Sequence, residues 1–443
     1  MMLRKSLVIL LSFSMLSTPA WASGFALNAQ SAETLGSAMA GAQAQRATPS
    51  AAAYNPASIV GIDDVAGSLT VFGVFVDSGY DTASGTLLGV APVPGVSSGQ
   101  SVIDDGVFPD ASIAMRLSDR IFLGVTLSAP FGFGTAFEDD SVIRYHGTKS
   151  KVASGALTSI LGFQLNDQWA VAGGFRVQYT DITLDGAIDA AGIAAASMIP
   201  GFTPGTDDAF FELGASDFGF GYVVGVQGQL TPELHVGASF TSKIEHDFTG
   251  DADFDISTSI AGQTLASFGL FQDTGFALDI TAPAQFQFGA ALDVSPRMTL
   301  LASTTLTRWS RFEELIAVFE NAAQPPDVLT QNWRDNWTVS LGAEYELSPS
   351  STARLGVMYE QMPLDDDFAS PRLPDTDRVW LGAGYSKRIG ADTTLHLGAS
   401  YIFFQERVIN QSAALPENQL RGSLATSFDI SAILVTAGID FGF

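Results

Sequence analysis

The feature that most restricts the fold of this chain is a long alternation of apolar residues with small or polar ones. At the C-terminal end, Ile433, Val435, Ala437, Ile439, Phe441 and Phe443 alternate with Leu434, Thr436, Gly438, Asp440 and Gly442. A period of two is that of a β-strand, in which successive side chains point to opposite faces. The chain therefore ends in a strand with one apolar face and one face that is mostly small or polar.

The same alternation recurs along the chain, and Trp or Tyr often brackets the apolar face. Examples are the segments 169–179, 337–345, 379–385 and 395–403. Strands of soluble proteins average about 5–6 residues, whereas these patterns extend to the roughly 9–11 residues that cross a bilayer at a tilt. Aromatic residues at strand ends match the interfacial girdles of outer-membrane barrels. We therefore expect lipid at the apolar face and a lumen at the other.

The connections between the strands are of two kinds, and they set the strand count. Short turns such as Ser118-Asp119 and Asn166-Asp167 alternate with long loops such as 77–106 and 185–216. The pattern predicts an all-β fold, a transmembrane barrel of fourteen antiparallel strands with both ends of the chain on the side of the short turns. The predicted strands are 65–76, 107–117, 120–128, 150–165, 168–182, 217–230, 233–248, 281–294, 297–308, 334–347, 351–362, 377–389, 392–406 and 427–443.

The N-terminus has the organisation of an export signal. Arg4 and Lys5 precede an apolar run from Leu7 to Leu16, and Ala20-Trp21-Ala22 has the small residues of a cleavage site. The run is shorter than a membrane span, which argues against an uncleaved anchor. We therefore predict that residues 1–22 are a signal peptide, removed after Ala22.

Composition excludes several kinds of function. The formal net charge is −26, so nucleic acid is not an expected partner, because phosphate contacts need Lys and Arg. The chain has no Cys, which removes zinc-thiolate sites. Acidic clusters such as Asp365-Asp366-Asp367 lack EF-hand spacing and are interpreted as solvated loops. The four His lie in unrelated contexts without a nucleophile motif, so we expect no enzyme, no cofactor and no metal.

Residues 23–62, between the predicted cleavage site and the first strand, are mostly Ala, Gly and Ser. Such small side chains have little to bury in a core of their own, but they fit a compact plug inside a barrel lumen. On composition alone, a loose periplasmic tail is the alternative. The barrel itself is assigned to residues 63–443.

A series of short motifs occurs in a fixed order along the chain. The N-terminal segment contains Gly24-Phe25, Leu35-Gly36-Ser37-Ala38 and Asn55-Pro56-Ala57. The barrel region follows with Phe218-Gly219-Phe220-Gly221-Tyr222, Ala282-Pro283-Ala284, Thr307-Arg308-Trp309-Ser310-Arg311-Phe312, Trp333-Arg334-Asp335 and Pro374-Asp375-Thr376-Asp377-Arg378-Val379-Trp380-Leu381. Over essentially the whole mature chain, this ordered set resembles the FadL family, Gram-negative outer-membrane transporters for long-chain fatty acids and other hydrophobic compounds.

The resemblance implies an N-terminal hatch that contains Asn55, Pro56 and Ala57, and a third strand whose kink opens sideways through the wall. In this chain the third strand runs into Pro130, Phe131, Gly132, Phe133 and Gly134. Proline cannot donate to a β-ladder and glycine weakens one, so these residues are the predicted lateral opening. The alternative is an ordinary strand end that enters a loop.

The predicted function is a passive outer-membrane channel that takes up hydrophobic molecules and releases them sideways into the bilayer. Fatty-acid members of the family are thought to hold the carboxylate with basic side chains, but the corresponding segments here read Thr183-Leu184-Asp185-Gly186 and Leu329-Thr330-Gln331-Asn332. A carboxylate buried without a cation is costly. Long-chain fatty acids and neutral hydrocarbons or aromatics therefore both stay open as substrates. The alternative function is a general porin for small polar solutes.

Two further groups of residues are candidate sites. Apolar residues on predicted extracellular loops form either a lid or a hydrophobic capture groove, and the candidates are Ile193, Met198, Leu265, Phe268 and Phe271. Charged residues on predicted lumen faces are expected to pair with one another or with the plug rather than with ligand: Arg176, Glu344, Arg378 and His396.

The expected partners follow from this membrane assignment. They are a hydrophobic small molecule, the lipid and lipopolysaccharide of the Gram-negative outer membrane, and the barrel-assembly machinery, to which Phe443 would present an aromatic C-terminus. We expect the barrel to be a monomer.

Overall fold

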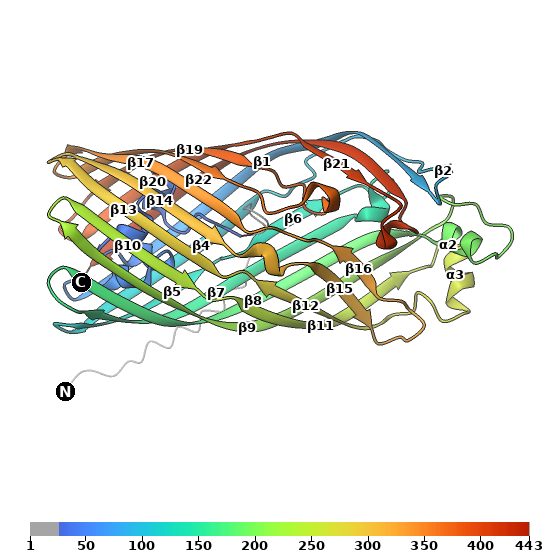
Figure 1. Ribbon diagram of the computed structural model, residues 1–443, viewed down its shortest axis with the longest axis horizontal. Helices are drawn as coiled ribbons and strands as arrows, with labels where there is room; N and C mark the ends of the chain where they lie inside the picture. The colour runs from blue at the N-terminus through green and yellow to red at the C-terminus, as the bar shows by residue number, and fades with distance from the viewer. Residues whose placement is uncertain (1–25, 443) are drawn as a thin grey trace.

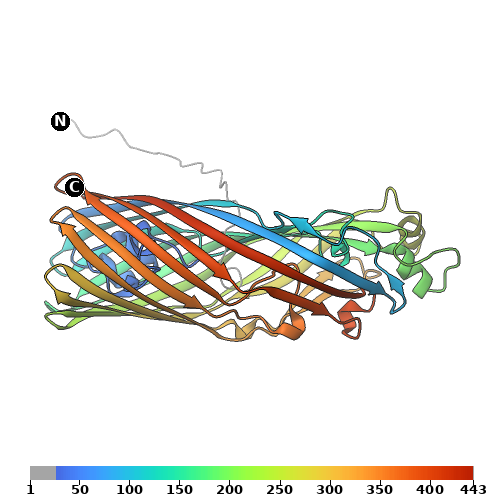
Figure 2. The same ribbon diagram turned by 90° about the horizontal axis from the view of Figure 1, so that it is seen from above.

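The wall of the molecule is one antiparallel sheet that closes on itself (Figures 1 and 2). The computed structural model describes residues 26–442, so the predicted leader, Gly24-Phe25 and Phe443 lie outside the described residues. Closure joins β1 (Val65–Leu87) to β22 (Ser423–Gly442), with Phe72 opposite Thr436. The predicted barrel of fourteen antiparallel strands is confirmed.

Several of the fourteen wall positions are occupied by two strands in succession. These are β5 (Ile121–Ser128) with β6 (Gly132–Ala136), β10 (Leu234–Thr241) with β11 (Ile244–Asp255), β12 (Thr274–Ala282) with β13 (Gln285–Ser295), and β20 (Thr393–Phe404) with β21 (Arg407–Gln411), which both pair with β22. The other wall strands are β1, β4 (Gly106–Ser118), β7 (Lys149–Gln164), β8 (Trp169–Asp189), β9 (Asp208–Thr231), β14 (Met298–Thr307), β17 (Asn336–Ser348), β18 (Ser351–Glu360), β19 (Arg378–Arg388) and β22.

Shorter elements lie in the loops and in the lumen. The loop strands are β2 (Ala91–Pro92), β3 (Gly99–Gln100), β15 (Glu314–Phe319) and β16 (Asp327–Thr330). The α-helices are α1 (Ala32–Leu35), α2 (Ala190–Ala196) and α3 (Ile260–Ala266). The 3-10 turns are η1 (Ala42–Ala44), η2 (Pro49–Ala53), η3 (Pro56–Ile59), η4 (Arg144–His146), η5 (Trp309–Arg311), η6 (Asp366–Phe368) and η7 (Pro416–Asn418). Within residues 26–442, no helix is long and apolar enough to cross a membrane.

The alternation seen in the sequence becomes an outer apolar surface and an inner face. On β22, Ile433 and Val435 are 44% and 41% exposed, whereas Leu434 between them is 2% exposed. On β19, Leu381 is exposed while Arg378 and Trp380 are buried inside the barrel. Exposed apolar side chains in this quantity suit a lipid environment.

The N-terminal residues fill the lumen at the end of the short turns, which we call the turn end; the opposite end is the loop end (Figure 1). α1, η1, η2 and η3 all lie inside the wall there and contact it closely. At two contacts the wall must be glycine, because a Cβ on Gly237 would lie 1.7 Å from the Gln43 carbonyl oxygen and one on Gly356 would lie 2.0 Å from that of Ser37. Small residues on both surfaces thus allow the plug to sit against the backbone of the wall.

The third wall position is interrupted where β5 gives way to β6. The ladder between β4 and β5 ends at Ala111 and Leu127, whereas β6 continues along β7. The segment 102–104 replaces β4 as the other neighbour of β6, with a bridge between Ile103 and Thr135. The wall is therefore interrupted between β4 and β6, on either side of Pro130.

Two further interruptions of predicted wall strands were not predicted. β9 pairs with β10 as far as Val223 and Thr241, and with β11 only from Ser216 and Thr249 onward. Between β12 and β13 the break lies at Pro283 and Ala284. The segment 309–319, in which apolar residues stand at helical spacing, contains η5 and the strand β15 instead of a helix.

Candidate functional site

An apolar cavity lies in the lumen above the hatch, and we call it the lumen pocket. Its volume is about 100 Å³. Strands β6, β7, β8, β11 and β12 and the loops after β14 and β18 supply its walls. The apolar lining is Phe131, Phe133, Val152, Ile182, Leu184, Phe248, Leu278, Ile280, Ala282, Phe312, Leu315, Leu329, Trp333 and Leu373.

One cation, Arg372, reaches the lumen pocket from the loop between β18 and β19. Its Nη1 donates to the carbonyl oxygen of Lys149 and to Ser150 Oγ, both at 2.9 Å. Its Nε is buried and has no hydrogen-bond partner among residues 26–442. Burial and the nearby guanidinium of Arg421 lower the pKa of Arg372 to about 10, which still leaves it charged at neutral pH. The lining of the pocket therefore includes a charged guanidinium.

A second arginine of this region, Arg334, lies away from the lumen pocket. Arg334 is 67% exposed and pairs with Asp365 at the surface, and it does not line the lumen pocket. Leu184, Leu329 and Gln331, from the two segments that contain no basic residue, do line it. Arg372 was missed because its partners Lys149 and Ser150 lie more than two hundred residues away in the sequence.

Below the lumen pocket lies a smaller and more polar space, the hatch chamber, of about 60 Å³. The hatch supplies Asn28, Gln30, Gln43 and Tyr54, and the wall supplies Arg176, Gln178, Gln285, Gln287, Ser303, Thr304, Thr305, Thr338 and Ser340. Phe131, Gln178 and Ala282 line both spaces. A molecule that leaves the lumen pocket therefore meets amides and hydroxyls on the way down.

The predicted lateral opening, Pro130 to Gly134, borders both spaces. Phe131 and Phe133 line the lumen pocket, and Pro130 lines the hatch chamber. The hatch covers this segment from inside, because the Leu27 N–H donates to the Pro130 carbonyl oxygen at 2.8 Å and Ala26 forms an antiparallel bridge with Phe131. Phe131 also packs against Trp309, with ring centroids 6.3 Å apart.

A third space of about 480 Å³, the loop groove, is mostly apolar and lies among the loops at the loop end. Its lining includes Ile188, Phe211, Leu213, Phe254, Leu270 and Phe319. Of the predicted groove residues, Ile193 and Phe271 line it. Leu265 is buried where α2 and α3 pack together, whereas Met198 and Phe268 are 90% and 69% exposed.

The predicted lumen charges lie in two networks and one chamber. Arg378 pairs with Glu360 at 2.8 Å, and Glu360 also accepts a hydrogen bond from hatch residue Asn28. Glu344 pairs with Arg354, a residue that sequence reasoning did not select, and Arg354 binds hatch residue Glu33. His396 lies beside this second network, and Arg176 lines the hatch chamber.

The predicted hatch motif is buried against the wall. Asn55 Nδ2 donates to the carbonyl oxygens of Gln43 at 2.8 Å and Val226 at 3.0 Å, and Asn55 Oδ1 accepts from the Ala57 N–H. Pro56 begins η3, where its missing N–H removes no hydrogen bond. The motif therefore connects three parts of the plug and wall: η1, η3 and β9.

Comparisons with known proteins agree with this architecture. Residues 13–443 match the family described as outer membrane protein transport protein (OMPP1/FadL/TodX). The chain is 25% identical to a long-chain fatty acid transport protein of Escherichia coli O6:H1 (89% of this chain, 90% of the relative) and 25% identical to outer membrane protein P1 of Haemophilus influenzae (86% of each).

Solved structures show the same fold. A Pseudomonas aeruginosa FadL homologue superposes with a TM-score of 0.86 at 21% identity, over 94% of this chain and 99% of that one. The Ralstonia pickettii toluene transporter TbuX superposes with a TM-score of 0.66 at 18% identity, over 93% and 98%.

Proposed function

Because this chain belongs to the OMPP1/FadL/TodX family of outer-membrane transport proteins, we propose that it takes up long-chain hydrophobic molecules by diffusion and releases them sideways through its wall. The observation that carries this proposal is the position of the lumen pocket: its apolar lining meets the interrupted third strand on one side and a polar, plugged chamber below. It acts in the outer membrane as a transport protein and not as an enzyme.

Capture begins in the loop groove. Ile193 and Phe271 are the proposed contacts, and Leu265 supports them by holding α2 against α3. Met198 and Phe268 project from the loop surface and offer the first apolar contact to an arriving molecule. Removal of apolar area from water contributes roughly 25 cal/mol per Å² at each step, so transfer from groove to lumen pocket needs no energy source.

The lumen pocket favours a long apolar chain with a carboxylate. Its lining suits an alkyl chain, and the unpartnered Nε of Arg372 supplies a charge-assisted donor for the head group. The E. coli relative is named for long-chain fatty acids and TbuX for toluene. Arg372 supports the first class of substrate for this chain.

Sideways release follows from the difference between the two spaces. An apolar ligand that entered the hatch chamber would displace water from its amides and hydroxyls without offering them hydrogen bonds, which is unfavourable. Displacement of Leu27 and Ala26 from Pro130 and Phe131 would connect the lumen pocket to the interruption between β4 and β6. Backbone groups at an opening have to face the lumen, because groups unsatisfied in lipid would each cost several kcal/mol.

The exit is tested by filling it. Gly132→Trp or Gly134→Trp should slow uptake of a hydrophobic substrate into cells and leave surface binding and barrel assembly unchanged. Gly173→Trp is the matched control, because a Cβ there meets no atom closer than 3.8 Å and the residue lies on the lipid side of β8. Wild-type uptake in both exit variants would place the route past the hatch.

The substrate class is tested separately with palmitate and hexadecanol, which share a chain length. Arg372→Met should weaken palmitate binding by about 10-fold or more, since a hydrogen bond to a charged group is worth about 1.5–3 kcal/mol, and leave hexadecanol binding unchanged. Arg334→Met, at the exposed arginine, is the control. Equal loss for both ligands would mean that Arg372 only maintains the shape of the pocket, and stronger hexadecanol binding in the wild type would identify a neutral substrate.

A general porin is the alternative function, and it would need an open aqueous lumen. The hatch opposes this, because α1 and the three 3-10 turns that follow it occupy the turn end of the barrel. We further propose that the protein acts as a monomer surrounded by lipid and lipopolysaccharide, and that Phe443 guides assembly.

A further inference from the structure

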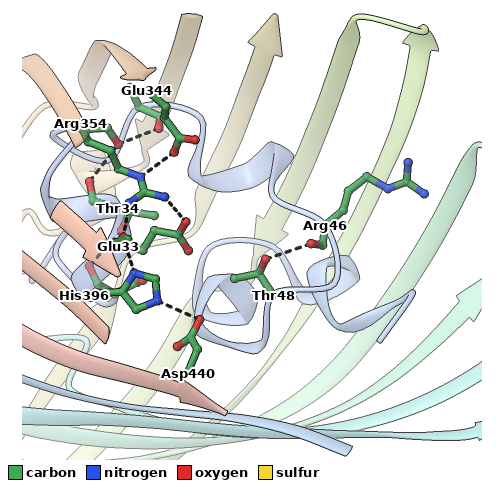
Figure 3. Close-up of polar contacts among 12 residues, drawn as sticks. Glu33, Thr34, Arg46, Thr48, Glu344, Arg354, His396 and Asp440 are labelled. Carbon is green, nitrogen blue, oxygen red and sulfur yellow. Dashed lines mark hydrogen bonds and ion pairs between the residues drawn. The ribbon is translucent and has the colours of Figure 1, made fainter. Parts of the chain in front are cut away.

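A cluster of charged and imidazole side chains joins the hatch to the wall at the turn end (Figure 3). Arg354 of β18 binds Glu33 of α1 at 2.5 Å and Glu344 of β17 at 2.7 Å. Beside them, His396 of β20 faces Asp440 of β22. One ligand-type atom each from Glu33, His396 and Asp440 lies within 4.8 Å of the other two. Three separate elements thus bring metal-ligating groups to one point.

The charges in this cluster do not balance. Glu33, Glu344 and Asp440 contribute three negative charges and Arg354 one positive charge, which leaves −2 when His396 is neutral. The carboxylates are poorly solvated, since their side chains are only 16%, 25% and 24% exposed. Like charges in such surroundings repel more strongly than in water. A dication at the cluster would neutralise the excess.

The imidazole of His396 provides an independent indication. Its side chain is 6% exposed, and its Nε2 has no hydrogen-bond partner among the described residues although it points toward Asp440. The Nε2 to Oδ2 distance is 3.5 Å, longer than the roughly 2.7–3.2 Å of a good N–H···O bond. Two ligands on a tetrahedral zinc ion, with bonds of about 2.0–2.2 Å, lie roughly 3.3–3.6 Å apart. The separation of His396 Nε2 and Asp440 Oδ2 therefore matches that of two ligands on one zinc ion.

The other nitrogen of the ring has the support that metal-bound histidines have. Nδ1 lies 2.7 Å from Ser386 Oγ, which also accepts a hydrogen bond from Arg354. Arg354 occupies one lone pair of this oxygen, and the second can accept from Nδ1–H; in that tautomer the Nε2 lone pair faces the carboxylates. Metal-binding histidines usually donate their second N–H in this way, which fixes the ring and raises its basicity.

We propose that Glu33, His396 and Asp440 bind one divalent ion of the zinc class and that this ion fastens the hatch to β20 and β22. An imidazole nitrogen with two carboxylate oxygens is a ligand set that zinc accepts, whereas Ca²⁺ and Mg²⁺ prefer oxygen alone. Arg354 stays paired with Glu344, so its charge is offset. Since Glu33 is the one ligand from the hatch, the ion links the plug to two neighbouring wall strands, β20 and β22.

The test uses the folded full-length mature protein in detergent, with Zn²⁺ alone as the probe. Competition against a chromophoric chelator should give one Zn²⁺ per chain. His396→Ala and Asp440→Asn should each weaken binding by at least about 10-fold, and His235→Ala, a half-buried histidine on β10, should not. Co²⁺ in place of Zn²⁺ should give visible d–d absorption that His396→Ala abolishes.

A second measurement examines the link to the hatch. The chain has no cysteine, so a single Ala47→Cys, at an exposed hatch position, carries a nitroxide label without interference. Zn²⁺ removal by a chelator should increase the mobility of the label in the wild-type background and have no effect with His396→Ala. Absence of binding in the wild type, or equal affinity in the wild type, His396→Ala and Asp440→Asn, would overturn the proposal. Native migration of unheated protein on gels confirms that each variant is folded.

Discussion

Tyr54 illustrates how single polar groups order the plug. Its hydroxyl accepts hydrogen bonds from the Gln30 N–H at 2.8 Å and Thr34 Oγ1 at 3.1 Å, and it donates to the Asn28 carbonyl oxygen at 3.0 Å. The ring is buried, with 7% of its surface exposed. Tyr54→Phe should destabilise the local hatch structure by about 1–3 kcal/mol. Hydrogen exchange of the peptide that covers Gln30 should accelerate by about 10-fold or more, while Tyr222→Phe, exposed on the lipid face, should not change it.

His146 makes the loops at the loop end sensitive to acid. Burial and the guanidiniums of Arg421 and Arg372 lower its pKa from 6.5 to about 3. Above pH 6.5, His146 is neutral in both the folded and the unfolded chain, so it does not make the free energy of unfolding depend on pH there. As the pH falls from 6.5 toward 3, His146 binds a proton in the unfolded chain but stays neutral in the folded one. The free energy of unfolding therefore decreases. At pH 5 the loss is about 2 kcal/mol.

The measurement is the shift of thermal unfolding temperature between pH 7.5 and pH 5.0. His146→Gln should reduce this shift, because glutamine does not titrate in that range. His235→Gln, at a half-buried position on β10, is the matched control and should keep the wild-type shift. An unchanged shift in His146→Gln would assign the acid sensitivity to the carboxylates.

At the scale of the element, the third wall position decides whether the exit is open. Ala26 and Phe131 are opposite each other in an antiparallel bridge, and such pairs have Cα atoms about 4.5–5.5 Å apart, within the range of a disulfide. Oxidation of an Ala26→Cys, Phe131→Cys double variant should therefore lock the hatch segment over the opening. Uptake should fall several-fold on oxidation and recover on reduction, so the reduced protein is its own control. Equal uptake by the oxidised and the reduced protein would show that the hatch segment does not control the exit.

The wall could be predicted from sequence because lipid imposes a period of two on every strand. Val379, Leu381 and Tyr385 were assigned to the lipid face and are exposed in the structure. The extent of β8 and β9 beyond the bilayer could not be predicted, since strands among the loops need no apolar face. The break between β10 and β11 is also invisible in the sequence, because Ser242 and Lys243 carry no turn signal.

The site was less predictable than the wall for a related reason. Arg372 enters the lumen pocket from a loop, and nothing in the pattern of residues 363–376 marks it as an inward side chain. Glu33 and Arg354 meet only when the hatch is placed inside the barrel. Position in a loop or plug is set by tertiary contacts, which local periodicity does not encode.

At the scale of the whole molecule, the barrel separates a lipid-facing apolar surface from a polar lumen that the hatch occupies. Asn55 connects the hatch to β9 through Val226, and Gln227 Nε2 donates to the Ala57 carbonyl oxygen at 2.8 Å. The motif therefore both donates a hydrogen bond to the wall and accepts one from it. A plugged lumen should conduct few ions, in contrast to a general porin, whose wide barrel leaves an aqueous channel.

Replacement of Asn55-Pro56-Ala57 by Gly-Ser-Gly removes the hydrogen bonds of the Asn55 side chain together with the fixed φ of Pro56, which starts η3. The released plug should become mobile in the lumen, and planar-bilayer conductance should rise several-fold above that of the wild type. A Gly-Ser-Gly replacement of Ser412-Ala413-Ala414, in a loop beyond β21, is the matched control and should keep the low conductance. Because a carrier of hydrophobic molecules needs no continuous water path, its uptake can persist while its ion conductance is low. High conductance in the wild type would instead favour the porin, and equal conductance in both folded variants would show that the motif does not hold the plug.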